Sequence, residues 1–580
     1  MITVLNFQKV QEVVPLKWFV SFSEENKEHL ILWPIAVFFG LSILRVQPMG
    51  QSICKISFDD SVLFEMWMYN YYDCQWLVFG SILCLVLTWN IIFGELQRRQ
   101  CGEWVRGLMG DKLELVELQS SKYQEIALRF MCDLNVNLAI CTLILCECML
   151  FCWCFGPYSV NGMGEFLAVD ETVWIMQLIG SCLILGPLVV ARLCQVYIRN
   201  EFVYLCYFLF LFTLLVFLCT DWVGFIIAAE GIAFSLYVFA ILQDSRAINF
   251  SIVKASEQYI LFGIFASGVL IFGVSIIYGA TGLSLFDWMP LWVFGFFETN
   301  RLFVVGIMLF LIGWFFKVSM VPLHSWIVPV YTSVNDLIVM LFAIYTKTIF
   351  VLILIGKFSV MLSSSVVQWW LFFCGAVSMV VGTIGGLSQV NIKGLLAYSA
   401  ISNIGLVGLV LSYNTTQAIW LAVGYILCYA LTVLSIFIGL FAFRPQFDGS
   451  VFLRSVYDYQ SSMLLSPMLS LWVVLAFVAL MGLPPFVLFV FKVLALFVVI
   501  NFWLSIVVSM FVVVISVLGI VYYVRLLREI FFYNEVIKHS MVEGLMFNWP
   551  NKAEYVNLFC GILVFLLMSL TIFIFILFLQ

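Results

Sequence analysis

Charged residues are scarce in this chain of 580 residues, at 10% of the total, against about 25% in a typical soluble domain. Hydrophobic residues make up 64%, and the mean hydropathy is +1.11. The net charge of -6 provides no footprint for nucleic acid, and the basic residues are spread over short loops. This composition excludes a soluble globular domain and a nucleic-acid-binding protein, and it indicates an all-α polytopic membrane protein.

Motifs for cofactor chemistry are also missing. The chain has no GxxxxGK[ST] loop for nucleotide phosphates, and no GxGxxG segment opens a helix after a strand. Among the 17 cysteines, the densest run would point to several faces of one helix rather than converge on a metal: Cys146, Cys148, Cys152 and Cys154. We expect these cysteines to pack as small apolar residues, with no cofactor and no metal bound by this chain.

Long apolar runs dominate the rest of the chain. At about 20 residues per crossing, they predict about 15 transmembrane helices. The predicted spans are 29–46, 76–95, 135–154, 173–196, 202–219, 222–242, 258–279, 303–325, 337–356, 366–387, 395–411, 418–442, 466–503, 506–527 and 558–579. If the chain alternates sides, 20 of its 27 Lys and Arg residues fall on one side and four on the other. The positive-inside rule then places the N-terminus on the inner side and the C-terminus on the outer side.

Four ionisable residues lie within spans that are otherwise apolar: Glu230, Lys317, Lys347 and Lys492. A charge near the bilayer centre costs about 2.5 to 3.5 kcal/mol on insertion scales, so several together require a reason. The functional reason is the movement of protons or other ions. The structural alternative is that each charge reaches a lipid headgroup or forms one salt bridge that locks two helices.

Helix-breaking residues accompany two of these lysines. Gly313 and Pro322 flank Lys317, and the pair Pro484 and Pro485 precedes Lys492 by seven residues. This recurrence predicts two inverted five-helix repeats, each with a broken helix, as in transporters that bind substrates at mid-membrane. The predicted organisation is an inner-surface segment 1–28, N-terminal helices 29–196 with a polar loop 96–134, repeats 202–356 and 366–527, and a loop with a C-terminal helix 528–580.

Three further residues are candidate proton relays. His324 follows Lys317 by seven residues, which is two helical turns if the helix continues, although a lone histidine is more often a hydrogen-bonded structural group. Glu147 lies in the cysteine-rich span, where it could instead face a polar group on a neighbouring chain. Lys393 is the third candidate.

Several motifs resemble a known family. The stretch FKVSMVPLHSWIVPVYTSVNDLIVMLFAIYTKTIF, residues 316–350, is similar to the signature of chain 2 of proton-pumping NADH:ubiquinone oxidoreductase, respiratory complex I. The matching positions are Lys317, Pro322, His324, Trp326, Tyr331 and Lys347. QVNIKGLLAYSAISNIG at 389–405 and GLPPFVLFVFK at 482–492 resemble further family motifs, and Glu230 occupies the acidic position of the family's fifth helix.

The resemblance implies an antiporter-like subunit of a mitochondrial inner-membrane complex, with its N-terminus in the matrix and its C-terminus in the intermembrane space. NADH, FMN, iron–sulfur clusters and ubiquinone would be bound by other subunits. The implied partners are antiporter-like chain 4, the small chain 4L and lipids, without nucleic acid. The family core has fourteen helices, so the span at 29–46 is expected to be an added N-terminal helix.

The residues also suggest how protons would move. At about 6 Å and an effective dielectric constant near 20, a Glu230–Lys317 pair is worth about 2.8 kcal/mol. Separating the pair would favour transfer of the Lys317 proton to Lys347 and then to Lys492 along a hydrated path. The alternatives are chain 4 or 5 of the same complex, a cation/proton antiporter subunit, and a structural membrane-arm spacer whose charges only lock helices.

Overall fold

The computed structural model describes residues 139–140, 143, 171–193, 200–242, 250–286, 301–442, 467–500, 505–531 and 561. All of them belong to one compact unit, Tyr72–Gln580. The predictions for the N-terminal segment 1–28, the polar loop 96–134, Glu147 and its neighbouring cysteines lie outside these residues. The same holds for nearly all of the predicted C-terminal span 558–579.

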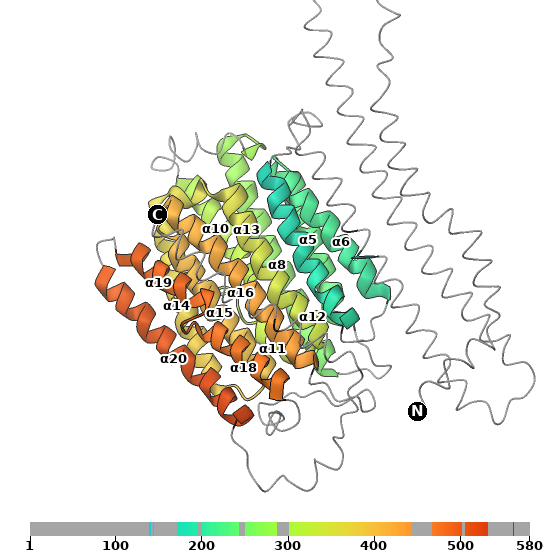
Figure 1. The fold of residues 1–580 in the computed structure, drawn as a ribbon. Coiled ribbons are helices and arrows are strands. Elements are labelled where there is room, and N and C mark those ends of the chain that lie inside the picture. The colour runs from blue at the N-terminus through green and yellow to red at the C-terminus, as the bar shows by residue number, and fades with distance from the viewer. Residues whose placement is uncertain are drawn as a thin grey trace, which may run out of the picture. The chain divides into compact units, whose positions relative to one another are not determined.

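Helices make up the regular structure of the described residues, apart from one isolated bridge between Asp221 and Leu285 (Figure 1). The elements are α5 (Glu171–Leu193), α6 (Asn200–Leu218), α7 (Trp222–Ile241), α8 (Phe250–Thr281), α10 (Arg301–Val318), α11 (Ile327–Ser333), α12 (Asp336–Leu341), the π-helical segment η2 (Phe342–Thr346), α13 (Lys347–Phe358), the 3-10 turn η3 (Met361–Ser363), α14 (Ser365–Ser388), α15 (Ile392–Leu411), α16 (Thr416–Ala442), α18 (Pro467–Met481), α19 (Val487–Ile500) and α20 (Ser505–Phe531).

The all-α polytopic fold predicted from the sequence is confirmed. Ten helical stretches among the described residues are long and apolar enough to cross a membrane, and α18 and α19 are shorter apolar helices. Helices are required there because hydrocarbon offers no partner to a free backbone N–H or C=O group. Each predicted span between 173 and 527 corresponds to one to three of the helical elements.

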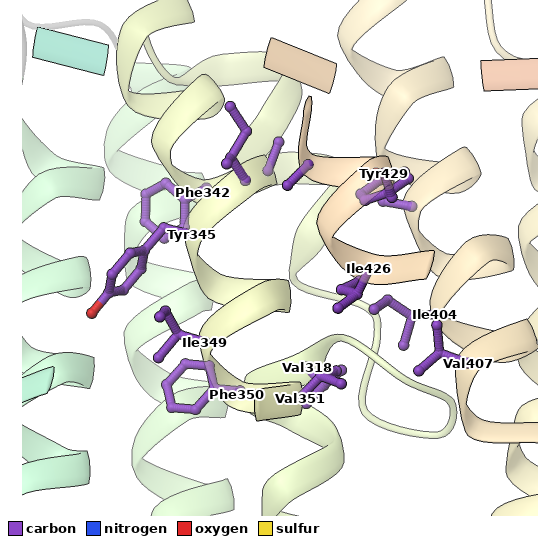
Figure 2. Packing of buried hydrophobic residues seen from close by; sticks show 14 of the residues in the cluster. Val318, Phe342, Tyr345, Ile349, Phe350, Val351, Ile404, Val407, Ile426 and Tyr429 are labelled. Carbon is purple, nitrogen blue, oxygen red and sulfur yellow. The ribbon is translucent and has the colours of Figure 1, made fainter. Parts of the chain in front are cut away.

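One span, Asp336–Phe358, contains an 18-residue stretch that is completely buried by the rest of the chain, and we call it the central span. It combines α12, η2 and α13, and it packs against α5, α10 and α16. In Figure 1, α5 and α6 lie on one flank of the bundle and α20 on the opposite flank. Figure 2 shows apolar side chains of the central span together with residues of α15 and α16, including Phe342, Ile349, Phe350, Ile404, Val407 and Ile426.

Two spans are broken, and the breaks share a backbone pattern. The first helix ends at Val318 and resumes with α11, whereas the second ends at Met481 and resumes with α19. The residue that follows each helix has positive φ, 68° at Ser319 and 73° at Gly482. In each break a cis X-Pro bond follows, at Val321-Pro322 and Pro484-Pro485. The predicted span 303–325 thus contains a break, as Pro322 indicated, and its helix ends at residue 318.

Gly313 was expected to contribute to the first break, and this prediction is wrong. Gly313 lies inside α10, which is continuous until five residues later. It is a packing residue: a Cβ atom at this position would come within 2.6 Å of the Ala266 carbonyl oxygen and of the Leu270 Cβ atom on α8. The missing side chain thus allows α10 and α8 to approach closely, as small residues do between membrane helices.

Candidate functional site

Glu230 and Lys317 form an ion pair within the helical bundle. Glu230 lies in the middle of α7, and Lys317 is in the last turn of α10. The Lys317 Nζ atom is 2.9 Å from Glu230 Oε1 and donates a second hydrogen bond, of 3.2 Å, to the Ala229 carbonyl oxygen. The lysine side chain is 5% exposed and the glutamate side chain 22%. The pair is in direct contact, closer than the separation of about 6 Å assumed from sequence.

An aromatic ring contacts the lysine of this pair, and a tryptophan is bonded to the backbone beside it. The Lys317 Nζ atom lies 5.7 Å from the centre of the Phe350 ring, which belongs to the central span. Next to Lys317 along the chain, the Phe316 carbonyl oxygen accepts a 3.0 Å hydrogen bond from the indole N–H of Trp326. The same carbonyl oxygen also accepts a 3.0 Å hydrogen bond from the Ser319 backbone N–H, so Trp326 joins the backbone where α10 ends. The ring contact and the ion pair together hold Lys317 inside the bundle.

Lys347 is completely buried and has a phenol as its partner. It begins α13, directly after the π-helical segment η2. Its Nζ atom donates a 2.8 Å hydrogen bond to the Tyr331 hydroxyl oxygen, and it lies 5.0 Å from the centre of the same ring. Such π-helical turns occur often at functional sites, because they change the direction of the side chains that follow. Sequence reasoning identified Lys347 but missed this role of Tyr331.

Lys492 faces the break in its own span. It lies in α19, and its Nζ atom donates a 2.8 Å hydrogen bond to the carbonyl oxygen of Met481, the last residue of α18. This carbonyl is one of the acceptors left open at a helix C-terminus, where a positive charge is also favourable. A Cβ atom on Gly482 would lie only 2.8 Å from the Lys492 Nζ atom, so the glycine leaves room for this contact.

The three lysines stand on elements that pack in series. α10 contacts α13, α13 contacts α16, and α16 contacts α19. On α16, the buried Tyr425 hydroxyl donates a 2.6 Å hydrogen bond to Asn403 Oδ1 of α15, and the Tyr425 ring lies 6.5 Å from that of Phe491. Helix α16, which packs against the helices of both Lys347 and Lys492, therefore carries a buried polar group. Sequence reasoning missed Tyr425 and Asn403, although polar residues within apolar spans were the available signal.

The candidate relays have different outcomes. His324 lies in the break after α10, so the helical spacing that would have placed it two turns from Lys317 does not exist. Its Nδ1 atom is 3.3 Å from the Pro322 carbonyl oxygen. Lys393 forms an ion pair with Asp336, and Asp336 was not predicted as a site residue. Within the described residues, no group of three or more His, Cys, Asp or Glu side chains is arranged to hold a metal ion.

Residues 219–519 match the family described as NADH:quinone oxidoreductase/Mrp antiporter, transmembrane region. The chain belongs to this family. The match spans α7 to α20 and contains Glu230, Lys317, Lys347 and Lys492, and it confirms the resemblance inferred from the motifs.

Curated relatives include family members from mitochondria-bearing and bacterial organisms. The chain is 28% identical to NADH-ubiquinone oxidoreductase chain 2 of Rhizopus oryzae, over 54% of this chain and 60% of that protein. It is 27% identical to NADH-quinone oxidoreductase subunit N of Erythrobacter litoralis, over 65% of this chain and 77% of that protein. The chain thus spans about 60% of the length of several relatives that it matches, including the fungal one.

Chains of three solved membrane complexes share the fold. A chain of respiratory complex I from Thermus thermophilus superimposes with a TM-score of 0.60 at 24% identity, covering 77% of this chain and 94% of that chain. A chain of the Mrp complex from Dietzia sp. gives 0.64 at 16% identity, covering 85% and 95%. A chain of an archaeal membrane-bound sulfane sulfur reductase gives 0.63 at 18% identity, covering 85% and 94%.

Proposed function

We propose that this chain is a proton-translocating membrane-arm subunit of a respiratory NADH:quinone oxidoreductase, corresponding to chain 2. It carries out no redox chemistry itself. Other subunits bind NADH, FMN, the iron–sulfur clusters and ubiquinone, and antiporter-like chain 4 and the small chain 4L are its neighbours. Its location is the mitochondrial inner membrane, with the N-terminus in the matrix and the C-terminus in the intermembrane space.

The observation that carries this proposal is the ion pair between Glu230 and Lys317, within a bundle that also holds the buried Lys347 and the partly buried Lys492. Removing such charges from water is expensive, and an apolar pair of similar volume would often be at least as stable. Apolar packing would hold the two helices together at a lower cost in free energy, so a purely structural role does not explain these residues. Protonation that changes during a cycle gives a better explanation.

The proposed mechanism is a charge switch at Glu230. In contact with the carboxylate, the Lys317 amine holds its proton, because Coulomb attraction at 2.9 Å is about twice that at 6 Å. When quinone chemistry elsewhere in the complex separates the pair, the proton moves towards Lys347 and then Lys492. Reforming the pair reloads Lys317 from the inner side. The chain thereby converts movement of one carboxylate into directed transfer among amines that never leave the bundle.

Lys317→Met tests this function, because methionine fills a similar volume and carries no proton. In proteoliposomes that contain the assembled complex, we expect proton pumping per NADH oxidised to fall at least about tenfold, since the amine that pairs with Glu230 is lost. The matched control is Lys254→Met, which removes an exposed lysine of α8 and should leave pumping unchanged. Full coupled pumping by the Lys317→Met complex would support the spacer interpretation instead.

A second candidate function is a cation/proton antiporter subunit, which the family description and the shared fold with an Mrp chain favour. The two functions differ in their driving force. Antiport would be driven by an imposed sodium gradient without any NADH oxidation, whereas the proposed subunit moves protons only when NADH is oxidised. Purification of the chain within an assembly that oxidises NADH, with no sodium-driven flux, supports the first proposal.

A further inference from the structure

A second ion pair lies outside the group formed by Glu230, Lys317, Lys347 and Lys492. Lys393, near the start of α15, pairs with Asp336, the first residue of α12. The two side chains are 15% and 25% exposed, so water reaches this pair more easily than it reaches the fully buried Lys347. Lys393 also donates a 2.7 Å hydrogen bond to the Val334 carbonyl oxygen.

These contacts join the ends of three helices. Val334 caps the C-terminus of α11, where backbone carbonyls lack helical partners and a positive charge is favourable. Asp336 stands in the first turn of α12, where a negative charge is favourable, and the side chain of Asn335 makes no capping hydrogen bond there. The pair therefore fixes the short connection between α11 and the central span onto α15.

Half-helix α11 is held at both of its ends, and Tyr331 lies between them. At its N-terminal side, Trp326 is bonded to the Phe316 carbonyl oxygen. At its C-terminal side, Lys393 is bonded to Val334. Val334 follows Tyr331 by three residues, about one helical turn, so a shift of the C-terminal end of α11 also moves the Tyr331 hydroxyl.

We propose that Asp336 and Lys393 are positioning residues that hold Tyr331 against Lys347, and that opening their ion pair frees Lys347 for proton exchange. This inference rests on the proposed function. While the pair is closed, the Tyr331 oxygen accepts a hydrogen bond from Lys347 and stabilises the charged amine. When it opens, α11 loses its C-terminal anchor and the phenol moves away. The more accessible ion pair thus controls a proton on the buried Lys347 amine.

A double-mutant cycle tests whether Lys393 acts through Tyr331. We expect Lys393→Met to lower proton pumping per NADH about tenfold, the effect of losing a charge-assisted hydrogen bond. Tyr331→Phe should cause a similar loss, and the double variant should pump no worse than either single one. Lys393→Arg, which keeps the charge and the donors, should restore most pumping. Multiplying losses in the double variant would overturn the proposal, because they would mean that Lys393 acts independently of Tyr331.

Two further variants distinguish the positioning role from a loss of assembly and from a failure of the proposed function. NADH oxidation with an artificial acceptor measures the amount of assembled complex; if Lys393→Met prevents assembly, the cycle is run with Asp336→Asn, which keeps the side-chain shape. Multiplying losses there would contradict the proposal equally. Lys317→Met tests proton transfer itself: if it abolishes pumping while the Lys393 and Tyr331 losses multiply, only the positioning role fails. If it leaves pumping intact, the proposed function fails.

Discussion

The two broken spans share a backbone pattern and differ in where their lysine stands. Lys317 precedes the first break, in the last turn of α10, and reaches across to a carboxylate on α7. Lys492 follows the second break, ten residues after Gly482. Its side chain reaches back to the open carbonyl group of Met481. The first amine has a full counter-charge. Within the described residues, the second makes no ion pair.

This difference separates the tasks that a broken helix can support. A carboxylate partner gives Lys317 an attraction that a small displacement of α7 or α10 can remove, which suits a switch. The backbone carbonyl that faces Lys492 supplies only a dipole, and its position is fixed by α18. This arrangement suits a lysine that accepts a proton and soon releases it. Lys347 is hydrogen-bonded to a phenol on half-helix α11, a partner that is neither a carboxylate nor a backbone carbonyl. Its helix also lies between those of Lys317 and Lys492 in the packing order.

The largest stability effect should come from Glu230→Gln. It leaves Lys317 buried without a counter-charge, which costs about 2 to 4 kcal/mol in unfolding free energy after allowance for the partly exposed glutamate. Thermal unfolding of the purified complex measures this loss. The exposed Glu257 of α8 is the matched control, since Glu257→Gln should change stability by less than about 0.5 kcal/mol.

Lys492→Met should cost less than Glu230→Gln. It abandons no charge, and the Met481 carbonyl loses one hydrogen bond, which is worth about 1 to 3 kcal/mol when the acceptor stays buried. Part of this cost is offset because an apolar side chain replaces a partly buried amine. The same unfolding measurement compares the two variants directly. A larger loss for Lys492→Met would mean that Lys492 has a charged partner, and the contrast between the breaks would disappear.

Gly313→Ala probes how the first broken span is held against α8. The added methyl group would meet the Ala266 carbonyl oxygen and Leu270 at 2.6 Å, so overpacking should cost about 1 to 3 kcal/mol. Gly268 on α8 has open space around its Cβ position, and Gly268→Ala should be neutral or slightly stabilising. Equal stability of both variants, measured by thermal unfolding, would show that the α10 and α8 contact is looser than described.

The smallest effects should have opposite signs at the two matched positions after the helices. Gly482→Ala places a side chain at a φ of 73° and against the Lys492 amine, which should destabilise the chain by about 1 to 2 kcal/mol. Ser319→Gly relieves the same conformation at a φ of 68°, and it should be neutral or stabilising by up to about 1 kcal/mol. Destabilisation by both substitutions would show that the two breaks are not equivalent in backbone strain.

Sequence reasoning succeeded where one property of one segment decides the structure. Apolar length predicted the spans, and prolines predicted both breaks, because a residue without an N–H group interrupts a helix whatever surrounds it. The rarity of charge within apolar runs also identified Glu230 and Lys317 as residues of interest, before their contact was known.

It failed where the outcome depends on which elements meet. Tyr331 is one of many aromatic residues, and only the position of α11 makes it the partner of Lys347. Asp336 and Lys393 are 57 residues apart and stand at the ends of different helices, so neither span indicates the other. Gly313 was misread for the same reason: a glycine before a lysine and a proline looks like a break, but the proximity of α8 gives it a packing role.

The most direct test of the account is the structure of the assembled complex during NADH oxidation, resolved into its separate states by electron cryo-microscopy. The account predicts at least one state in which the Lys317 Nζ atom has left Glu230, and another in which the 2.9 Å contact is present. If the contact persists in every state while the complex pumps protons with full coupling, the charge switch at Glu230 is wrong.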